Sequence, residues 1–155
     1  MVLTAQKEAA HTPYGAVEAA TAFYRFVWQS PAPPTEELNP VSQAVMADDA
    51  NPTFRDLARS YAKVPDITGG VVSAGRPFHL STTNGVWMIE SNAVADRVTV
   101  DIATGYVIDG ALSPSKVAAI GMTMVWEHDA WHLLEGAQVD QAKVSNGAIR
   151  FTGGC

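Results

Sequence analysis

Within residues 120–136, large apolar side chains recur at every second position, with one interruption. Large apolar residues occupy every second position at the start of this stretch: Ile120, Met122, Met124 and Trp126. A period of two residues is typical of a β-strand with one buried face. The alternation stops over residues 127–130 and resumes at Trp131, which predicts a hairpin with a four-residue loop that places Trp126 beside Trp131. We expect this hairpin to form the middle of an antiparallel sheet.

The size and composition of the chain fit one folded domain. A chain of 155 residues is long enough to bury a hydrophobic core, and 47% hydrophobic with 17% charged residues is ordinary for a globular protein. The formal net charge is -6 and the basic residues are scattered. Because phosphate binding requires clustered Lys and Arg, this charge distribution argues against a nucleic-acid partner.

The sequence also bears on the cellular compartment. No apolar stretch approaches the length of a membrane span, and the first residues lack the basic start and apolar core of a signal peptide. We therefore expect a soluble chain, cytoplasmic if it is complete, or an exported domain whose leader or anchor lies outside it. The single cysteine, Cys155, is the last residue, which excludes an internal disulfide and Cys-rich metal sites. Its thiol is free to pair between chains or to remain unreactive.

The first half of the chain is predicted to be helical. Residues 1–11 are expected to form a flexible leader ahead of a single domain over residues 12–155. A cap residue followed by proline occurs three times, at Thr12-Pro13, Asn39-Pro40 and Asn51-Pro52. Proline is tolerated at the first helical position, where its missing N–H costs no hydrogen bond. These pairs predict a helix over residues 13–29 and two shorter helices, the last ending before Pro65.

The second half is predicted to be a sheet. From Asp66 onward, glycine pairs and β-branched residues appear and a period of two replaces the helical period. The predicted strands cover about 71–80, 85–92, 94–109, 117–127, 131–137 and 147–152. Asn84-Gly85 and Asn146-Gly147 predict two-residue hairpin turns. Helices followed by antiparallel strands define an α+β fold, in which the helices cover one face of a curved sheet.

Two segments resemble the NTF2-like (cystatin-like) fold group. They are the opening helix T-P-Y-G-A-V-E-A-A-T-A-F-Y (residues 12–24) and the closing hairpin M-T-M-V-W-E-H-D-A-W-H-L (residues 122–133). The hairpin is similar to the W-x-x-x-x-W-x-L ending common in that group. With the strand A-D-R-V-T-V-D-I (residues 95–102) they are spread over most of the chain, from residue 12 to residue 133. The resemblance implies a cone of helices on a curved sheet, and it implies a fold rather than an activity.

Within that group, the pattern most resembles VirB8-like and TcpC-like extracytoplasmic domains of actinobacterial conjugative elements. The resemblance implies a non-catalytic assembly component of a type IV secretion-like apparatus at the cell envelope. Such a component binds protein partners, including copies of itself, and is tethered by an upstream membrane helix that this sequence does not contain. A second resemblance is to SnoaL-like and ketosteroid-isomerase-related enzymes, although their catalytic motifs do not map onto this chain. No cofactor is expected in either case.

Asp101 is the main candidate for catalysis, with His79 as its companion. Asp101 lies in the middle of a predicted strand, and an aspartate facing a cavity can act as a general base whose pKa is raised by burial. The alternation nevertheless places Asp101 with Arg97 and Thr99, opposite the apolar side chains. We therefore expect Asp101 to be solvated; the alternative is a sheet with two buried faces.

Four further residues are candidates for lining the mouth of a small-ligand pocket: Tyr24, Trp28, Trp87 and Glu90. Aromatic walls with a few polar groups are typical of such pockets. The favoured interpretation is that the tryptophans are core or rim residues, since aromatics are commonly buried without binding a ligand.

A metal site is not expected. His128 and His132 are four residues apart but flank a hairpin loop, where this spacing does not make two imidazoles converge. No third ligand is evident, although Glu127 and Asp129 are near in sequence.

Two functions therefore remain open. A non-catalytic interaction domain predicts a filled interior and self-association. A small-molecule-binding protein, or a cofactor-independent isomerase or dehydratase, predicts a pocket of several hundred cubic ångströms with an inward carboxylate or imidazole. Continuous Val, Ile, Met and Trp on the concave face of the sheet favours the first function, and a polar cluster there favours the second.

Overall fold

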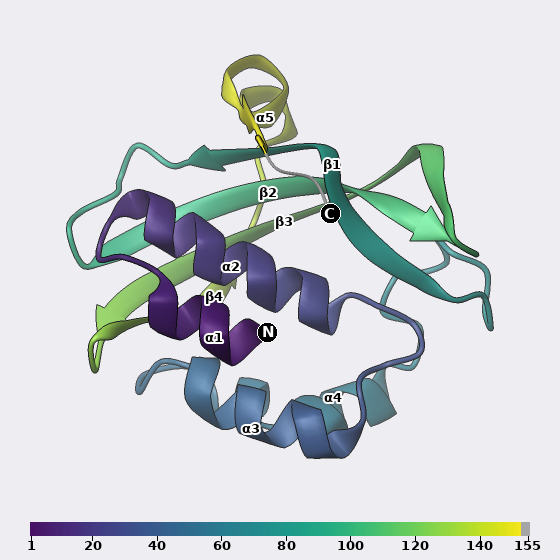
Figure 1. Ribbon diagram of the computed structural model, residues 1–155, viewed down its shortest axis with the longest axis horizontal. Coiled ribbons are helices and arrows are strands. Elements are labelled where there is room, and N and C mark those ends of the chain that lie inside the picture. Colours follow the sequence, from purple (N-terminus) through teal and green to yellow (C-terminus); the bar gives the residue numbers. More distant parts are fainter. Residues whose placement is uncertain (153–155) are drawn as a thin grey trace.

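An open antiparallel sheet with helices on its concave side forms the body of the protein (Figure 1). The computed structural model describes residues 1–152, so Cys155 lies outside the described residues. The strands follow the order β4-β3-β2-β1-β5, and every neighbouring pair is antiparallel. Their bounds are β1 (Phe78–Ile89), β2 (Arg97–Ile108), β3 (Ala111–Glu127), β4 (Ala130–Ala137) and β5 (Ile149–Arg150). The predicted α+β class is confirmed.

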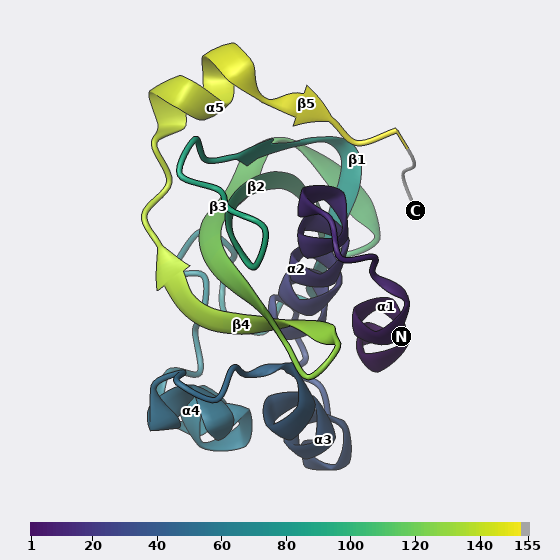
Figure 2. The same cartoon turned by 90° about the vertical axis from the view of Figure 1, so that its left-hand side faces the viewer.

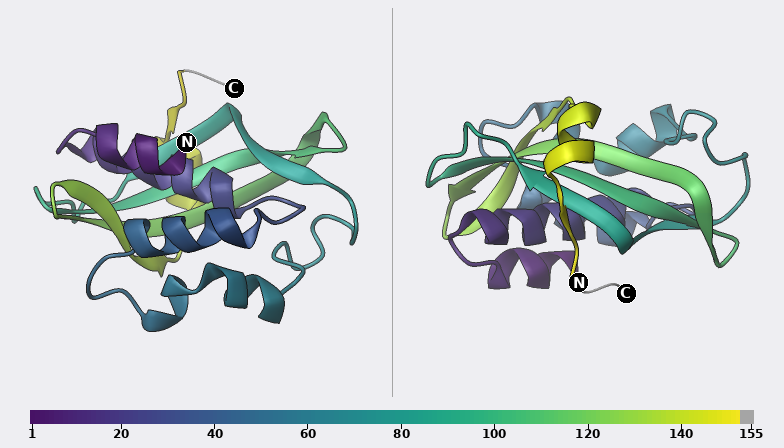
Figure 3. Two further views of the ribbon diagram at one scale, coloured as in Figure 1. Left: turned by 60° about the horizontal axis from the view of Figure 1, so that its bottom comes forward. Right: turned by 90° about the horizontal axis from the view of Figure 1, so that it is seen from above.

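The sheet curls around helix α2, and helix α5 lies on the opposite side of the strands (Figures 2 and 3). Helix α1 packs against both α2 and α3, and α3 also packs against β4. No helix within residues 1–152 is long and apolar enough to cross a membrane. The bounds are α1 (Val2–Glu8), α2 (Pro13–Val27), α3 (Thr35–Val45), the 3-10 helix η1 (Pro52–Arg55), α4 (Leu57–Lys63) and α5 (Gln141–Gly147).

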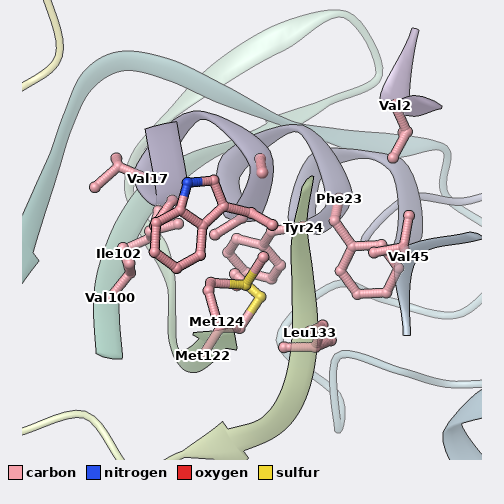
Figure 4. Packing of buried hydrophobic residues seen from close by; sticks show 14 of the residues in the cluster. Val2, Val17, Phe23, Tyr24, Val45, Val100, Ile102, Met122, Met124 and Leu133 are labelled. Atoms are coloured by element: carbon pink, nitrogen blue, oxygen red, sulfur yellow. The ribbon is translucent and has the colours of Figure 1, made fainter. Parts of the chain in front are cut away.

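Apolar side chains fill the space between α2 and the sheet (Figure 4). Alternate residues of β2 and β3 face the helices and are at most 1% exposed: Val98, Val100, Ile102, Met122 and Met124. They meet side chains from the helices and from β4: Val17, Phe23, Tyr24, Val45, Trp131 and Leu133. Full burial of one such side chain contributes about 1.5–3 kcal/mol. This continuous apolar lining is the one expected of a scaffold.

The β3–β4 hairpin confirms the predicted aromatic pair. Trp126 lies opposite Trp131, with ring centroids 5.5 Å apart and planes at 73°. The predicted four-residue loop is wrong: only His128 and Asp129 form the turn, both with positive φ, as in the tight turns that match the twist of paired strands. The predicted position is also wrong, because β4 is an edge strand and β2 occupies the middle of the sheet.

The prediction of a flexible leader over residues 1–11 is wrong, because this segment contains the packed helix α1. Gln6 is buried, and its Nε2 donates hydrogen bonds to the carbonyl oxygens of Ala44 (2.9 Å) and Trp131 (3.0 Å). Trp131 Nε1 in turn donates to the carbonyl of Ala10 (2.9 Å). These polar contacts join segments far apart in sequence, so local periodicity did not reveal them.

The predicted helix starts are correct in part. α2 begins at Pro13 as predicted. Asn51 caps a helix start as predicted, but only the short η1 follows it, and the rest of the predicted helix is the separate α4, which has its own cap at Asp56. α3 begins earlier than predicted, at Thr35, so Pro40 lies inside it rather than at its first position. Two glutamates in the first turn of α3 stabilise this earlier start, since acidic groups are favourable at a helix N-terminus.

The two predicted asparagine–glycine hairpins are absent from the described chain. β1 runs through Asn84, and its pairing with β2 shifts between Ser81 and Val86, which is the irregularity of a β-bulge. The strands predicted over 71–80 and 85–92 are therefore one strand that begins at Phe78. The second asparagine–glycine pair ends α5, so the strand predicted from residue 147 shrinks to the two residues of β5.

We predict that Gln6→Ala lowers the free energy of unfolding by about 1–3 kcal/mol, because it removes the donor to two carbonyl groups, one buried and one partly buried. Lys7→Ala is the matched control on the exposed side of α1 and should change stability by less than about 0.5 kcal/mol. Urea unfolding of both variants provides the measurement. Equal stabilities would contradict the packing of α1.

Candidate functional site

The outer face of the sheet, which is the face turned away from α2, is partly covered by α5 (Figure 3). Asp101 lies on this face in β2, between Met88 of β1 and Gly121 of β3. Its chain neighbours Val100 and Ile102 point into the core under α2. At this point the sheet is therefore buried on both faces.

Asp101 has no exposed surface. Neither of its carboxylate oxygens has a hydrogen-bond partner within residues 1–152. The expectation that Asp101 is solvated is therefore wrong, and the alternative of two buried faces is correct. The alternation of β2 correctly separates Asp101 from the apolar side. It could not reveal that a helix forming some forty residues later would cover the polar side.

Gly121 provides the space that the Asp101 carboxyl occupies. A Cβ at this position would lie 2.9 Å from Asp101 Oδ1 and 2.5 Å from the carbonyl oxygen of Ala137. Both distances are too short for a methyl group, so any larger residue would displace the carboxyl or separate β3 from β4.

Glu90 is the acidic neighbour of Asp101. It follows the last residue of β1, and its backbone N–H donates to the carbonyl of Thr99 (2.9 Å). Lys143 of α5 approaches Glu90, with 3.5 Å between Nζ and Oε2. The pair links α5 to the sheet, but the lysine side chain is 58% exposed, so the contact is weak.

The surroundings favour the neutral form of Asp101. Burial above all, and then the neighbouring Glu90 carboxyl, raise the pKa of Asp101 to about 7, while the Lys143 ammonium acts in the opposite direction. A carboxyl with such a pKa can gain or lose a proton near neutral pH. It cannot touch a substrate while α5 is in place, because none of its surface is exposed.

His79 does not join Asp101. It is exposed on β1 and lies opposite Val107, six positions along β2 from Asp101. Six strand residues span about 20 Å, so the two candidate catalytic groups are too far apart to act on one substrate.

The four candidate ligand-binding residues lie in three separate places. Tyr24 is in the core, with its ring centroid 5.7 Å from that of Trp28, whose Nε1 donates to the hydroxyl of Tyr106 (2.8 Å). Trp87 packs near the start of α2, against Tyr14. Glu90 belongs to the outer face. These residues therefore do not line one common pocket.

Two pockets that share Tyr61 and Ile67 lie beside the C-terminal end of α2. The larger encloses about 350 Å³ and the smaller, apolar one about 210 Å³. The larger contains one carboxylate, Asp66. Hydrogen bonds from the hydroxyl and the backbone N–H of Thr68 lower the pKa of Asp66, so this carboxylate is ionised and already engaged.

A polar cluster at the β3–β4 turn contains one residue that the sequence analysis missed, Asp48. One carboxylate oxygen each of Asp48 and Glu127 and one ring nitrogen of His128 lie within 4.8 Å of one another. These are atom types that can bind a metal ion. His128 Nε2 is 2.7 Å from Asp48 Oδ2, and Glu127 Oε1 accepts the backbone N–H of Asp48 (2.6 Å). The hydrogen bond between the side chains raises the pKa of His128 and lowers that of Asp48. An exposed ion pair explains this geometry, and His132 is not part of the cluster.

Comparison of the chain with protein-family models, with curated proteins and with solved structures gives no match. The NTF2-like and VirB8-like resemblance therefore stays a prediction.

We predict that Gly121→Ala destabilises the fold by about 1–3 kcal/mol, since its methyl group overlaps Asp101 and Ala137. Gly136→Ala is the matched control on β4, where the nearest atom to an added Cβ is 4.0 Å away. Thermal and urea unfolding compare the two. A Gly121→Ala protein as stable as Gly136→Ala would show that β3, β4 and Asp101 are not packed as described.

Proposed function

We propose that the protein is a non-catalytic interaction domain that binds protein partners, copies of itself among them. The observation that carries this proposal is an uncovered apolar area on the outer face, beyond the reach of α5. The concave side supports it as well, because the Val, Ile, Met and Trp side chains that line it pack directly against α2 and its neighbours.

This area, the outer patch, consists of Val107, Leu112, Val117 and Ala119. Strand register places all four on the face that carries Asp101. Leu112 is 41% and Val117 61% exposed. Contiguous apolar surface of this kind marks interaction sites in soluble proteins, because its exposure to water is unfavourable.

The strand edge next to the outer patch is also open. β3 pairs with β4 only from Gly121 onward, so within residues 1–152 no strand lies beside residues 111–120 on that side. Pro114 and Lys116 lie in this segment, and both residue types discourage uncontrolled pairing of strand edges. We infer that partners bind the apolar face of the strands rather than extend the sheet.

The proposed setting follows from the resemblance of residues 12–24 and 122–133 to VirB8-like and TcpC-like domains. On this proposal the chain is an extracytoplasmic part of a conjugative type IV secretion-like apparatus, tethered by a membrane segment outside this sequence. An interaction surface in place of a catalytic centre is what such an assembly component requires.

We predict that the protein self-associates and that Val117→Asp shifts it toward monomer, because a buried unpaired charge in the interface is costly. Val94→Asp is the matched control: Val94 is equally exposed, at 61%, but lies in the β1–β2 connection. Sedimentation velocity over a range of concentrations gives the result. A wild-type protein that is monomeric throughout, or two variants that behave alike, would count against self-association through the outer patch.

Small-ligand binding is the second candidate, favoured by the 350 Å³ pocket beside α2. Its volume is within the usual range for small-molecule sites. Isomerase or dehydratase chemistry has less support there, because Asp66 is engaged by Thr68 and Asp101 lies across the sheet. Ligand-induced thermal stabilisation that disappears in Tyr61→Ala would favour this candidate.

A further inference from the structure

Helix α5 is held to the sheet by few contacts. It has seven residues, of which only Val144 is buried. A helix this short is not stable in water without tertiary contacts. Its described polar link to the strands is the 3.5 Å pair between Lys143 and Glu90. A small change in the interaction free energy between α5 and the residues that it covers can therefore decide whether α5 stays docked.

Asp101 is placed to supply that change. Its carboxyl is fully buried and has no hydrogen-bond partner within residues 1–152. Burial of a neutral carboxyl is tolerable, whereas burial of an unpaired carboxylate is very unfavourable. Displacement of α5 would let water reach the carboxylate and remove this penalty.

We propose that Asp101 is a proton-binding site that controls α5. With the proton bound, α5 stays docked on the outer face; when the proton leaves, docking weakens and α5 is released more often. Release uncovers Met88 and the strands beneath, which lie on the same face as the outer patch. The inference does not depend on the proposed function.

The charged groups around Asp101 determine the direction of the response. Glu90 lies at the end of β1, and Asp140 and Lys143 belong to the segment of α5. β3 contributes Gly121 and Thr123, which carry no charge, and Thr123 shares a 3.1 Å hydrogen bond with the Thr99 hydroxyl. Further along this face Arg97 and Glu135 pair with each other at 3.5 Å.

The pH dependence follows from the two states of α5. The pKa of Asp101 is raised to about 7 when α5 is docked, and it falls to its ordinary range when α5 is released. Docking is therefore strongest below that ordinary range. As the pH rises toward 7, the equilibrium constant for docking falls by about tenfold per pH unit, because one proton is released with α5. Above pH 7 the constant no longer changes.

Trypsin cleavage after Lys143 measures release, because the bond is protected within a docked helix. Cleavage of the wild type is divided at each pH by cleavage of Asp101→Asn, which cancels the pH dependence of trypsin itself. We expect this ratio to rise by about tenfold per pH unit between about pH 5.5 and 7 and then to level off. A ratio that stays constant with pH would overturn the proposal.

Two further variants keep the test decisive if Asp101→Asn does not fold. Glu90→Gln removes a negative charge that raises the pKa of Asp101, so the rise in cleavage should move to lower pH. Asp129→Asn changes an exposed aspartate at the β3–β4 turn and should behave as the wild type. If Glu90→Gln and Asp129→Asn show the same midpoint, the proposal is wrong.

Discussion

Strand β2 is packed on both faces, and the rest of the structure depends on this double burial. On one face Val98, Val100 and Ile102 meet α2 and the core. On the other, Asp101 lies under α5 without a partner in the described chain. The first contact holds the fold together through apolar burial. The second contact is tolerated while the Asp101 carboxyl is neutral and becomes electrostatically unfavourable when the carboxyl ionises.

The two faces suggest a division of roles. The concave side carries the core, where the apolar side chains of β2 and β3 pack against α2, so it contributes mainly to stability. On the outer face, α5 covers Asp101 and Met88, and exposed apolar side chains lie beyond it, at Leu112 and Val117. Binding and its control are therefore proposed for the same face, with α5 at the boundary between the covered and uncovered halves.

The sequence predicted those features that depend on local patterns. The alternation around Trp126 and Trp131 identified their pairing, and Thr12-Pro13 identified the start of α2. Features formed by contacts distant in sequence were not predictable in this way. Gln6 anchors α1 through backbone groups more than thirty residues away, and the burial of Asp101 depends on a short helix whose sequence resembles a turn and a strand.

The most direct test of double burial is the protonation of Asp101 itself. The chemical shift of its side-chain carboxyl carbon, followed by NMR as a function of pH, reports the protonation of this carboxyl directly. Burial beneath α5 predicts a midpoint near pH 7, where the buried carboxyl has its pKa. A midpoint near the ordinary aspartate value of about 3.9 would show that water reaches the carboxyl and that the outer face is not buried there.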